Sequence, residues 1–137
     1  MPQLRKDPVT KRWVIILHEE AKSPKDFKIN NTPRQSNKCP FCSGNESMTP
    51  NEVMSYRSPD TLPNQPGWEV RVIPNKFPAL QIEGDLDRTG LGVYDMMNGI
   101  GAHEVIIESP EHEAGFQNYS KEQIARIIRT YADRYRD

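Results

Sequence analysis

The chain has 137 residues, which suits one domain and is small for a two-domain enzyme. Hydrophobic residues make up only 35 % of it, and 12 prolines and 8 glycines predict long ordered loops around a thin core. The 18 basic and 19 acidic residues leave a net charge of −1, which excludes the strongly basic surface of proteins that bind nucleic acid or anionic membranes.

The first predicted element is a strand over residues 13–17, Trp-Val-Ile-Ile-Leu, which follows the turn-like sequence of residues 7–10. Its β-branched apolar residues predict burial on both faces. This is the longest apolar run, far too short to span a membrane, and the first residues lack the apolar segment that is typical of a signal peptide. We therefore expect a soluble, cytoplasmic protein. A polar loop rich in Pro and Asn follows over residues 22–38.

A second strand is predicted over residues 68–73, where Trp68, Val70 and Val72 alternate with other residues before Pro74. This alternation predicts one buried face, and proline should end the ladder. Residues 83–101 contain five glycines and are interpreted as a long loop with, at most, a brief edge strand at its centre.

A third strand is predicted over residues 103–108, ended by Ser109-Pro110. A helix should begin after Ser120, which is a good N-cap, with Gln123 completing a capping box. Apolar residues then recur at helical spacing and should face a sheet; they are Ile124, Ile127, Ile128, Tyr131 and Tyr135. The helix also carries arginines, which we interpret as a solvated face rather than a phosphate site; they are Arg126, Arg129, Arg134 and Arg136.

The only two cysteines, Cys39 and Cys42, enclose Pro-Phe in a Cys-x-x-Cys motif. A tight turn of this kind allows both thiolates to bind one metal ion. A redox pair is the rival interpretation, but it requires a preceding strand and a following helix whose N-terminus lowers a thiol pKa. Neither flank predicts such elements, so we favour a metal site over a redox pair or inert thiols.

Two thiolates leave a tetrahedral site short of ligands, and the candidates are His18, His103 and His112. His103 lies within a predicted strand and has an alternative role as an ordinary half-buried histidine. His112 follows Ser109-Pro110 in a predicted turn, and a loop can bring it to the metal. The residues alone therefore favour His112 slightly.

Four ordered blocks together carry a specific resemblance. They are residues 4–15, residues 39–46 with the cysteine motif, residues 70–80 ending in Asn-Lys-Phe-Pro-Ala-Leu, and residues 101–112 with the pattern Gly-x-His-x-Val-x-Ile-Glu-Ser-Pro-x-His. In this order they resemble the galactose-1-phosphate uridylyltransferase family of the histidine-triad superfamily.

The resemblance implies an α+β fold, with a mostly antiparallel sheet curled into a histidine-triad-like half-barrel and a flanking helix. It implies that residues 1–137 form the N-terminal portion of an incomplete domain. It also implies a zinc site whose ligands are Cys39, Cys42 and His112, with a fourth ligand from a later histidine that this chain lacks.

The chemistry that the resemblance implies belongs to galactose and carbohydrate metabolism: exchange between UDP-glucose and galactose 1-phosphate through a nucleotidyl-histidine. The nucleophile lies in a His-x-His motif, which does not occur in this sequence, so we expect the chain alone to be inactive. Two alternatives are an ADP-sugar phosphorylase or other adenylyl-transferring relative, and a non-catalytic zinc-binding module.

By the same resemblance, the expected nucleotide contacts are Phe41, Ile73, Asn75, Lys76 and Val105. Asn75 is the strongest polar candidate because an amide can donate and accept hydrogen bonds, although a turn residue is an alternative interpretation. Residues 20–24, Glu-Ala-Lys-Ser-Pro, depart from the family's Arg-Ala-Lys-Arg-Pro and lack its two phosphate-binding arginines. The implied partners are a nucleotide sugar and a sugar phosphate, with a homodimer as the common assembly.

Overall fold

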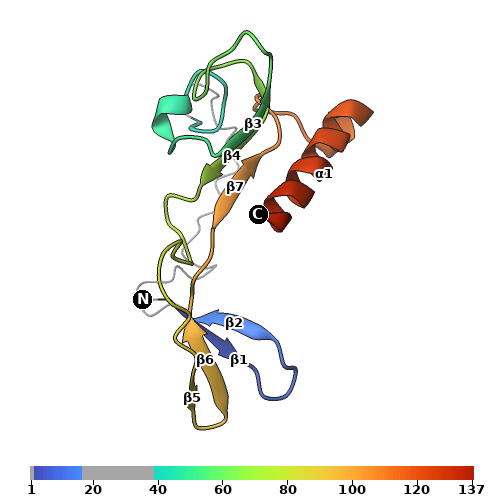
Figure 1. Ribbon diagram of the computed structural model, residues 1–137. Helices are drawn as coiled ribbons and strands as arrows, with labels where there is room; N and C mark the ends of the chain where they lie inside the picture. Colours follow the sequence, from blue (N-terminus) through green and yellow to red (C-terminus); the bar gives the residue numbers. More distant parts are fainter. Residues whose placement is uncertain (1, 17–38) are drawn as a thin grey trace. The chain divides into compact units, whose positions relative to one another are not determined.

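The computed structural model describes residues 2–16 and 39–137, which form two compact units. Of the described residues, 2–16 and 77–103 belong to the first unit, and 39–76 and 104–137 belong to the second. Figure 1 labels the strands and the helix of both. The polar loop expected before Cys39 lies outside the described residues, as do His18 and the segment 20–24. Within the described ranges, no helix is long and apolar enough to cross a membrane.

The first unit contains a four-stranded antiparallel sheet in the order β2-β1-β6-β5. Its strands are β1 (Gln3–Lys6), β2 (Trp13–Ile16), β5 (Thr89–Leu91) and β6 (Tyr94–Asn98). Asp7 makes the turn between β1 and β2, since its Oδ1 accepts hydrogen bonds of 2.8 Å from the N–H groups of Val9 and Thr10. A carboxylate that captures nearby backbone donors is typical of such turns.

Two expectations for this unit were wrong. The strand β2 forms, but Trp13, Val14 and Ile15 remain 41 %, 49 % and 41 % exposed, because no described element of the unit packs over the sheet as a second layer. The region expected to be a long loop instead contains the β5–β6 hairpin. Gly92 lies in the turn between β5 and β6 and has a φ of 60°, so a glycine that we interpreted as part of a loop belongs to a hairpin turn.

The second unit contains a three-stranded antiparallel sheet in the order β3-β4-β7. The strands are β3 (Met54–Arg57), β4 (Trp68–Pro74) and β7 (Glu104–Ile107). The core comprises Trp68, Ile73 and Ile107, with Val105 packed against it. Pro74 ends the ladder as expected, because it is the last residue of β4 and lies opposite Glu104 in the final pair of the register.

The central strand β4 is buried on both faces, whereas the sequence predicted one buried face. Arg71, only 1 % exposed, is the reason. Its Nε lies 2.9 Å from Glu52 Oε2, and Arg57 Nη2 lies 2.7 Å from the other oxygen of the same carboxylate. A buried charge is tolerated when paired and hydrogen-bonded, and a polar residue in an alternating pattern does not reveal such pairing.

The helix α1 (Lys121–Arg136) begins as expected, with Ser120 Oγ accepting a 3.1 Å hydrogen bond from Gln123 N–H. The Gln123 side chain, however, donates to the backbone oxygens of Glu69 and Glu108. It therefore joins the helix to the sheet, in place of the reciprocal capping-box bond that we predicted.

Only part of the expected apolar stripe on α1 is covered. Ile127 and Thr130 are fully buried, whereas Ile128, Tyr131 and Tyr135 are exposed. The arginines are not all on a solvated face, because Arg134 forms a 2.8 Å ion pair with Glu104 of β7. The fold class itself is confirmed: the described residues form antiparallel sheets with one C-terminal helix, an α+β arrangement with no closed barrel among them.

Candidate metal centre

The cysteine motif forms a tight turn stabilised by local hydrogen bonds. Cys42 N–H donates to Cys39 O at 3.3 Å, and the Asn45 side-chain amide donates to the same oxygen at 2.7 Å. Asn45 N–H in turn donates to Cys42 O at 3.1 Å. Gly44 has a φ of 94°, a conformation that L side chains rarely adopt. We call residues 39–46 the cysteine knuckle.

His112 lies on the segment that follows β7. Ser109 Oγ accepts a 3.0 Å hydrogen bond from Glu111 N–H, which tightens the turn after the strand. Pro110 O accepts a 3.4 Å hydrogen bond from Ser43 N–H of the cysteine knuckle. This bond joins the cysteine knuckle to the segment that carries His112, close to the cluster that Cys39, Cys42 and His112 form.

Cys39, Cys42 and His112 come together, and their ligand atoms all lie within 4.8 Å of one another. Cys42 Sγ is 3.2 Å from His112 Nδ1. In tetrahedral zinc sites the ligand atoms are separated by roughly 3.6–3.8 Å, so a small outward adjustment would fit the ion. His112 Nε2 is 3.8 Å from Glu113 Oε1, beyond hydrogen-bond distance, and the Glu113 side chain is exposed.

The environment of Cys42 favours a metal ligand over a redox thiol. Burial raises the pKa of the Cys42 thiol, and the neighbouring Cys39 raises it further. A reactive thiol needs a lowered pKa, commonly from a helix N-terminus. The first helical residues after Cys42 are the 3-10 turn η3 (Glu46–Met48), so no α-helix begins there to supply that effect.

Glu46, only 5 % exposed, was not expected to have a role of its own. Both carboxylate oxygens accept from Gly44 N–H, at 3.1 and 3.0 Å, and Oε1 also accepts a 2.8 Å bond from Trp68 Nε1. Burial alone would raise the pKa of this carboxyl, but the hydrogen bonds from Trp68 and the backbone outweigh it and lower the pKa. The carboxylate is therefore ionised inside the unit.

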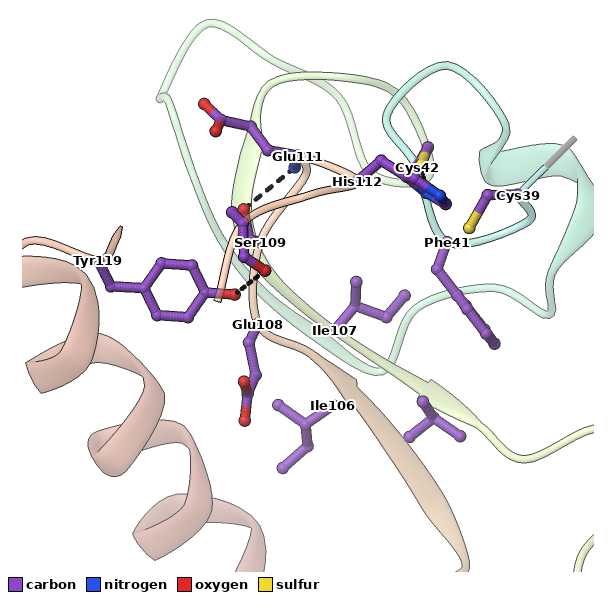
Figure 2. A pocket seen from close by; sticks show the side chains of 12 residues that line it. Cys39, Phe41, Cys42, Ile106, Ile107, Glu108, Ser109, Glu111, His112 and Tyr119 are labelled. Atoms are coloured by element: carbon purple, nitrogen blue, oxygen red, sulfur yellow. Dashed lines mark hydrogen bonds between the residues drawn. The ribbon is translucent and has the colours of Figure 1, made fainter. Parts of the chain in front are cut away.

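A pocket of about 330 Å³ is lined in part by Cys39, Cys42 and His112. Figure 2 shows the two cysteines, His112 and Phe41 at one end and Tyr119 at the other, with Ile107 between them. The middle is lined by β7 residues, including Val105. The pocket therefore combines an apolar wall with a metal-ligand cluster, as ligand sites commonly do.

The expected nucleotide contacts divide into two groups. Phe41 and Val105 line the pocket. Ile73 is paired with Val105 across the β4–β7 ladder but is itself buried in the core. Asn75 is half-buried and Lys76 is exposed, and neither belongs to the described lining.

Tyr119 lines the pocket, although the sequence did not indicate it as a site residue. Its hydroxyl donates a 3.4 Å hydrogen bond to Ala114 O. Burial raises the pKa of this phenol, and the charge of Glu108 raises it further. Tyr119 directly precedes the N-cap Ser120, and a tyrosine at that position commonly packs against the helix. The sequence pattern therefore did not indicate that Tyr119 lines a pocket.

The sequence matches the family described as galactose-1-phosphate uridyl transferase, N-terminal domain, over residues 1–137. ADP-glucose phosphorylase from Arabidopsis thaliana is 40 % identical over 139 residues, covering 97 % of this chain and 38 % of that protein. A crystal structure of an ADP-glucose phosphorylase from the same plant with bound ADP-glucose matches with a TM-score of 0.53 and 38 % identity. That match covers 99 % of this chain and 37 % of the other.

Two further structures are similar. A galt-like protein from Arabidopsis thaliana is 35 % identical, with a TM-score of 0.53, over 97 % of this chain and 35 % of the other. A uridylyltransferase structure is 24 % identical, with a TM-score of 0.57, over 98 % of this chain and 34 % of the other, which shows a shared fold alone. The chain thus spans 34–38 % of the length of these relatives.

Proposed function

The chain belongs to the galactose-1-phosphate uridyl transferase family, and on that premise we propose that it is the N-terminal portion of a nucleotidylyltransferase whose substrate is a nucleotide sugar. The observation that carries this proposal is the pocket, in which Phe41 and Val105 lie beside the Cys39, Cys42 and His112 cluster.

The metal that suits this cluster is zinc. Two thiolates and an imidazole nitrogen are a donor set that zinc prefers, and their present separations need little adjustment. Bound zinc would neutralise the thiolates and hold the cysteine knuckle to the segment that carries His112. Its role in the proposal is structural, and the chemistry of transfer belongs to other groups.

We infer a two-step reaction in the complete protein. A histidine attacks the α-phosphorus of the nucleotide sugar, forming a phosphorus–nitrogen bond as the sugar 1-phosphate leaves. Phosphate or a hexose 1-phosphate then attacks the same phosphorus and releases the histidine. This chain contributes pocket walls to that reaction, and it has no His-x-His motif to supply the nucleophile.

ADP-glucose is the first candidate substrate, because the 40 % identity to an ADP-glucose phosphorylase covers 97 % of this chain. UDP-glucose, with galactose 1-phosphate as acceptor, is the second, and the description of the matched family supports it. In either case Phe41 and Val105 would contact the base, with Ile73 behind them. Asn75 and Lys76 would then act beyond the pocket edge, on ribose or phosphate.

Equilibrium binding of each nucleotide sugar to the zinc-loaded chain tests this proposal. Phe41→Ala should weaken binding about tenfold, since stacking of a base on an aromatic ring is worth roughly 1–3 kcal/mol. Leu62→Ala is the control, because Leu62 is an exposed apolar residue outside the described pocket lining.

Tighter binding of ADP-glucose than of UDP-glucose would support the first candidate, and the reverse order the second. A zinc-loaded chain that binds neither would contradict the nucleotide-sugar proposal and favour the alternative of a non-catalytic zinc-binding module.

A further inference from the structure

The cysteine knuckle has a buried anchor whose residues are not metal ligands. Glu46 lies four positions after Cys42 and extends its carboxylate back to Gly44 N–H, within the turn that presents the Cys42 sulfur. The same carboxylate accepts from the indole of Trp68. One ionised group therefore holds both the knuckle backbone and a side chain from the sheet.

Trp68 fixes the other end of this anchor. It is 2 % exposed and packs with Ile73 and Ile107 in the core of the second unit. Ile107 is the last residue of β7, the strand that leads into the segment carrying His112. The Glu46–Trp68 hydrogen bond thus joins the cysteines to the sheet that positions the histidine.

We propose that Glu46 is a positioning residue for the metal centre: its carboxylate, held between Gly44 N–H and Trp68 Nε1, sets the separation of the cysteine knuckle from His112. This inference rests on the metal site of the proposed function. Groups outside the ligand shell that orient metal ligands typically change metal affinity by about 10–100-fold when altered.

The interactions of Glu46 favour a positioning role over a general contribution to stability. An aliphatic side chain could fill the same buried space without the desolvation of a carboxylate. The ionised group instead accepts from Gly44 N–H, two positions away in the knuckle, and from Trp68 Nε1, 22 positions away in the sheet, at distances of 2.8–3.1 Å. Charge-assisted bonds of this kind fix geometry more strongly than neutral ones.

Two variants test the proposal from opposite ends of the hydrogen bond. Glu46→Gln keeps the shape of the side chain but removes its charge and one acceptor oxygen. Trp68→Phe removes the indole N–H while retaining an aromatic ring in the core. Each should lower zinc affinity about 10–100-fold, measured by competition with a chromophoric chelator.

The double variant should lose less zinc affinity than the product of the two single losses, because both substitutions weaken the Glu46–Trp68 hydrogen bond. When cobalt(II) replaces zinc, the thiolate and ligand-field absorption bands of each variant should differ from those of the unsubstituted chain, compared per bound ion. A purely structural role would leave these spectra unchanged in the folded, metal-bound protein.

Ile127→Val is the control, since Ile127 is fully buried on α1 and lies outside the cysteine knuckle. It should lower the free energy of unfolding measured with chelator present, yet keep zinc affinity within about twofold of the original chain. If Glu46→Gln does not fold, Trp68→Phe still provides the measurement.

Zinc affinity and cobalt spectra unchanged in both variants would overturn the inference while leaving the metal site intact. Failure of the unsubstituted chain to bind zinc would instead overturn the metal site itself, so the two failures are distinguishable.

Discussion

Gly44 has a left-handed backbone conformation, with a φ of 94°, within the turn that follows Cys42. A Cβ at this position would meet no atom within 4 Å, so space does not limit substitution. Backbone strain does limit substitution, because an L residue in the left-handed region costs about 1–2 kcal/mol. Gly44→Ala should therefore lower the free energy of unfolding by about that amount, as measured by urea titration with chelator present.

Gly90→Ala is the matched control. Gly90 has no positive φ, and an added Cβ would lie 3.9 Å from Tyr94 O, an ordinary contact. Alanine there should leave the free energy of unfolding within about 0.5 kcal/mol of the original value. Equal destabilisation by both substitutions would contradict the argument from backbone strain.

His112 and His103 allow a second matched comparison. His112 Nδ1 lies at the metal cluster, whereas His103 Nδ1 accepts a 2.9 Å hydrogen bond from Ala79 N–H in the first unit. His112→Gln and Cys42→Ser should each lower the zinc content of the purified protein to a small fraction, as measured by elemental analysis. His103→Gln should leave it unchanged, and a loss of zinc only in this last variant would refute the ligand assignment.

The sequence was sufficient to predict the cluster of Cys39, Cys42 and His112, because the flanks of the Cys-x-x-Cys motif favoured a metal site over a redox pair and the family resemblance selected the histidine. It did not predict the part played by Glu46. A glutamate in a polar segment is compatible with solvent exposure. Its partner Trp68 is 22 positions away, and nothing local relates the two residues.

At the scale of elements, β3 and β4 are joined by the buried carboxylate of Glu52. Burial alone would raise its pKa, but hydrogen bonds from Ser55, Arg71 and Asn64 and the charge of Arg57 together lower it below the ordinary value of 4.5. Because the pKa is lowered in the folded state, Glu52 contributes stability above pH about 4.5 that is lost as pH falls through the lower, folded value.

Glu52→Gln should therefore destabilise the chain at neutral pH and flatten the fall in stability on acidification. The measurement is urea unfolding across pH 2 to 7 with chelator present. Asp60→Asn changes an exposed carboxylate in the same unit and is expected to leave the acid dependence nearly unchanged. If the stability of Glu52→Gln fell with acid as steeply as that of the original chain, the group responsible would be a residue other than Glu52.

The elements were predicted where the local pattern agreed with the final packing. Strand β7 follows from a short β-branched run that Ser109-Pro110 ends, and the start of α1 follows from a serine N-cap. The β5–β6 hairpin was missed because its glycines and polar residues have low strand propensity, and cross-strand pairing in the first unit outweighs it. The exposure of Tyr135 on α1 was missed because helical periodicity says which side chains share a face, but not how far the sheet beneath extends.

At the scale of the whole molecule, the chain should bind a nucleotide sugar without turning it over. The expected result follows from the absence of a His-x-His motif in these 137 residues. Incubation with a nucleotide sugar and either phosphate or hexose 1-phosphate, followed by chromatography of the nucleotides, should show no new product. Turnover by this chain would contradict the assignment of the nucleophile.

The α+β class and the family were accessible from sequence because four ordered blocks extend along most of the chain. The division into two units was not predicted, because one domain was the expectation for this length. The first unit combines the N-terminal strands with residues 77–103, and pairing between segments so distant in sequence leaves no local signal.

The candidate metal site brings together Cys42 and His112, which are 70 positions apart, and a bound ion would link them. A cross-link of this span acts on the unfolded chain as well as on the folded one, since it removes conformations that the free chain would otherwise sample. By the loop-closure relation used for disulfides, closing such a loop is worth about 4 kcal/mol. A bound ion would thus link these distant segments as a disulfide does, but reversibly, so that removing zinc with a chelator should lower the free energy of unfolding.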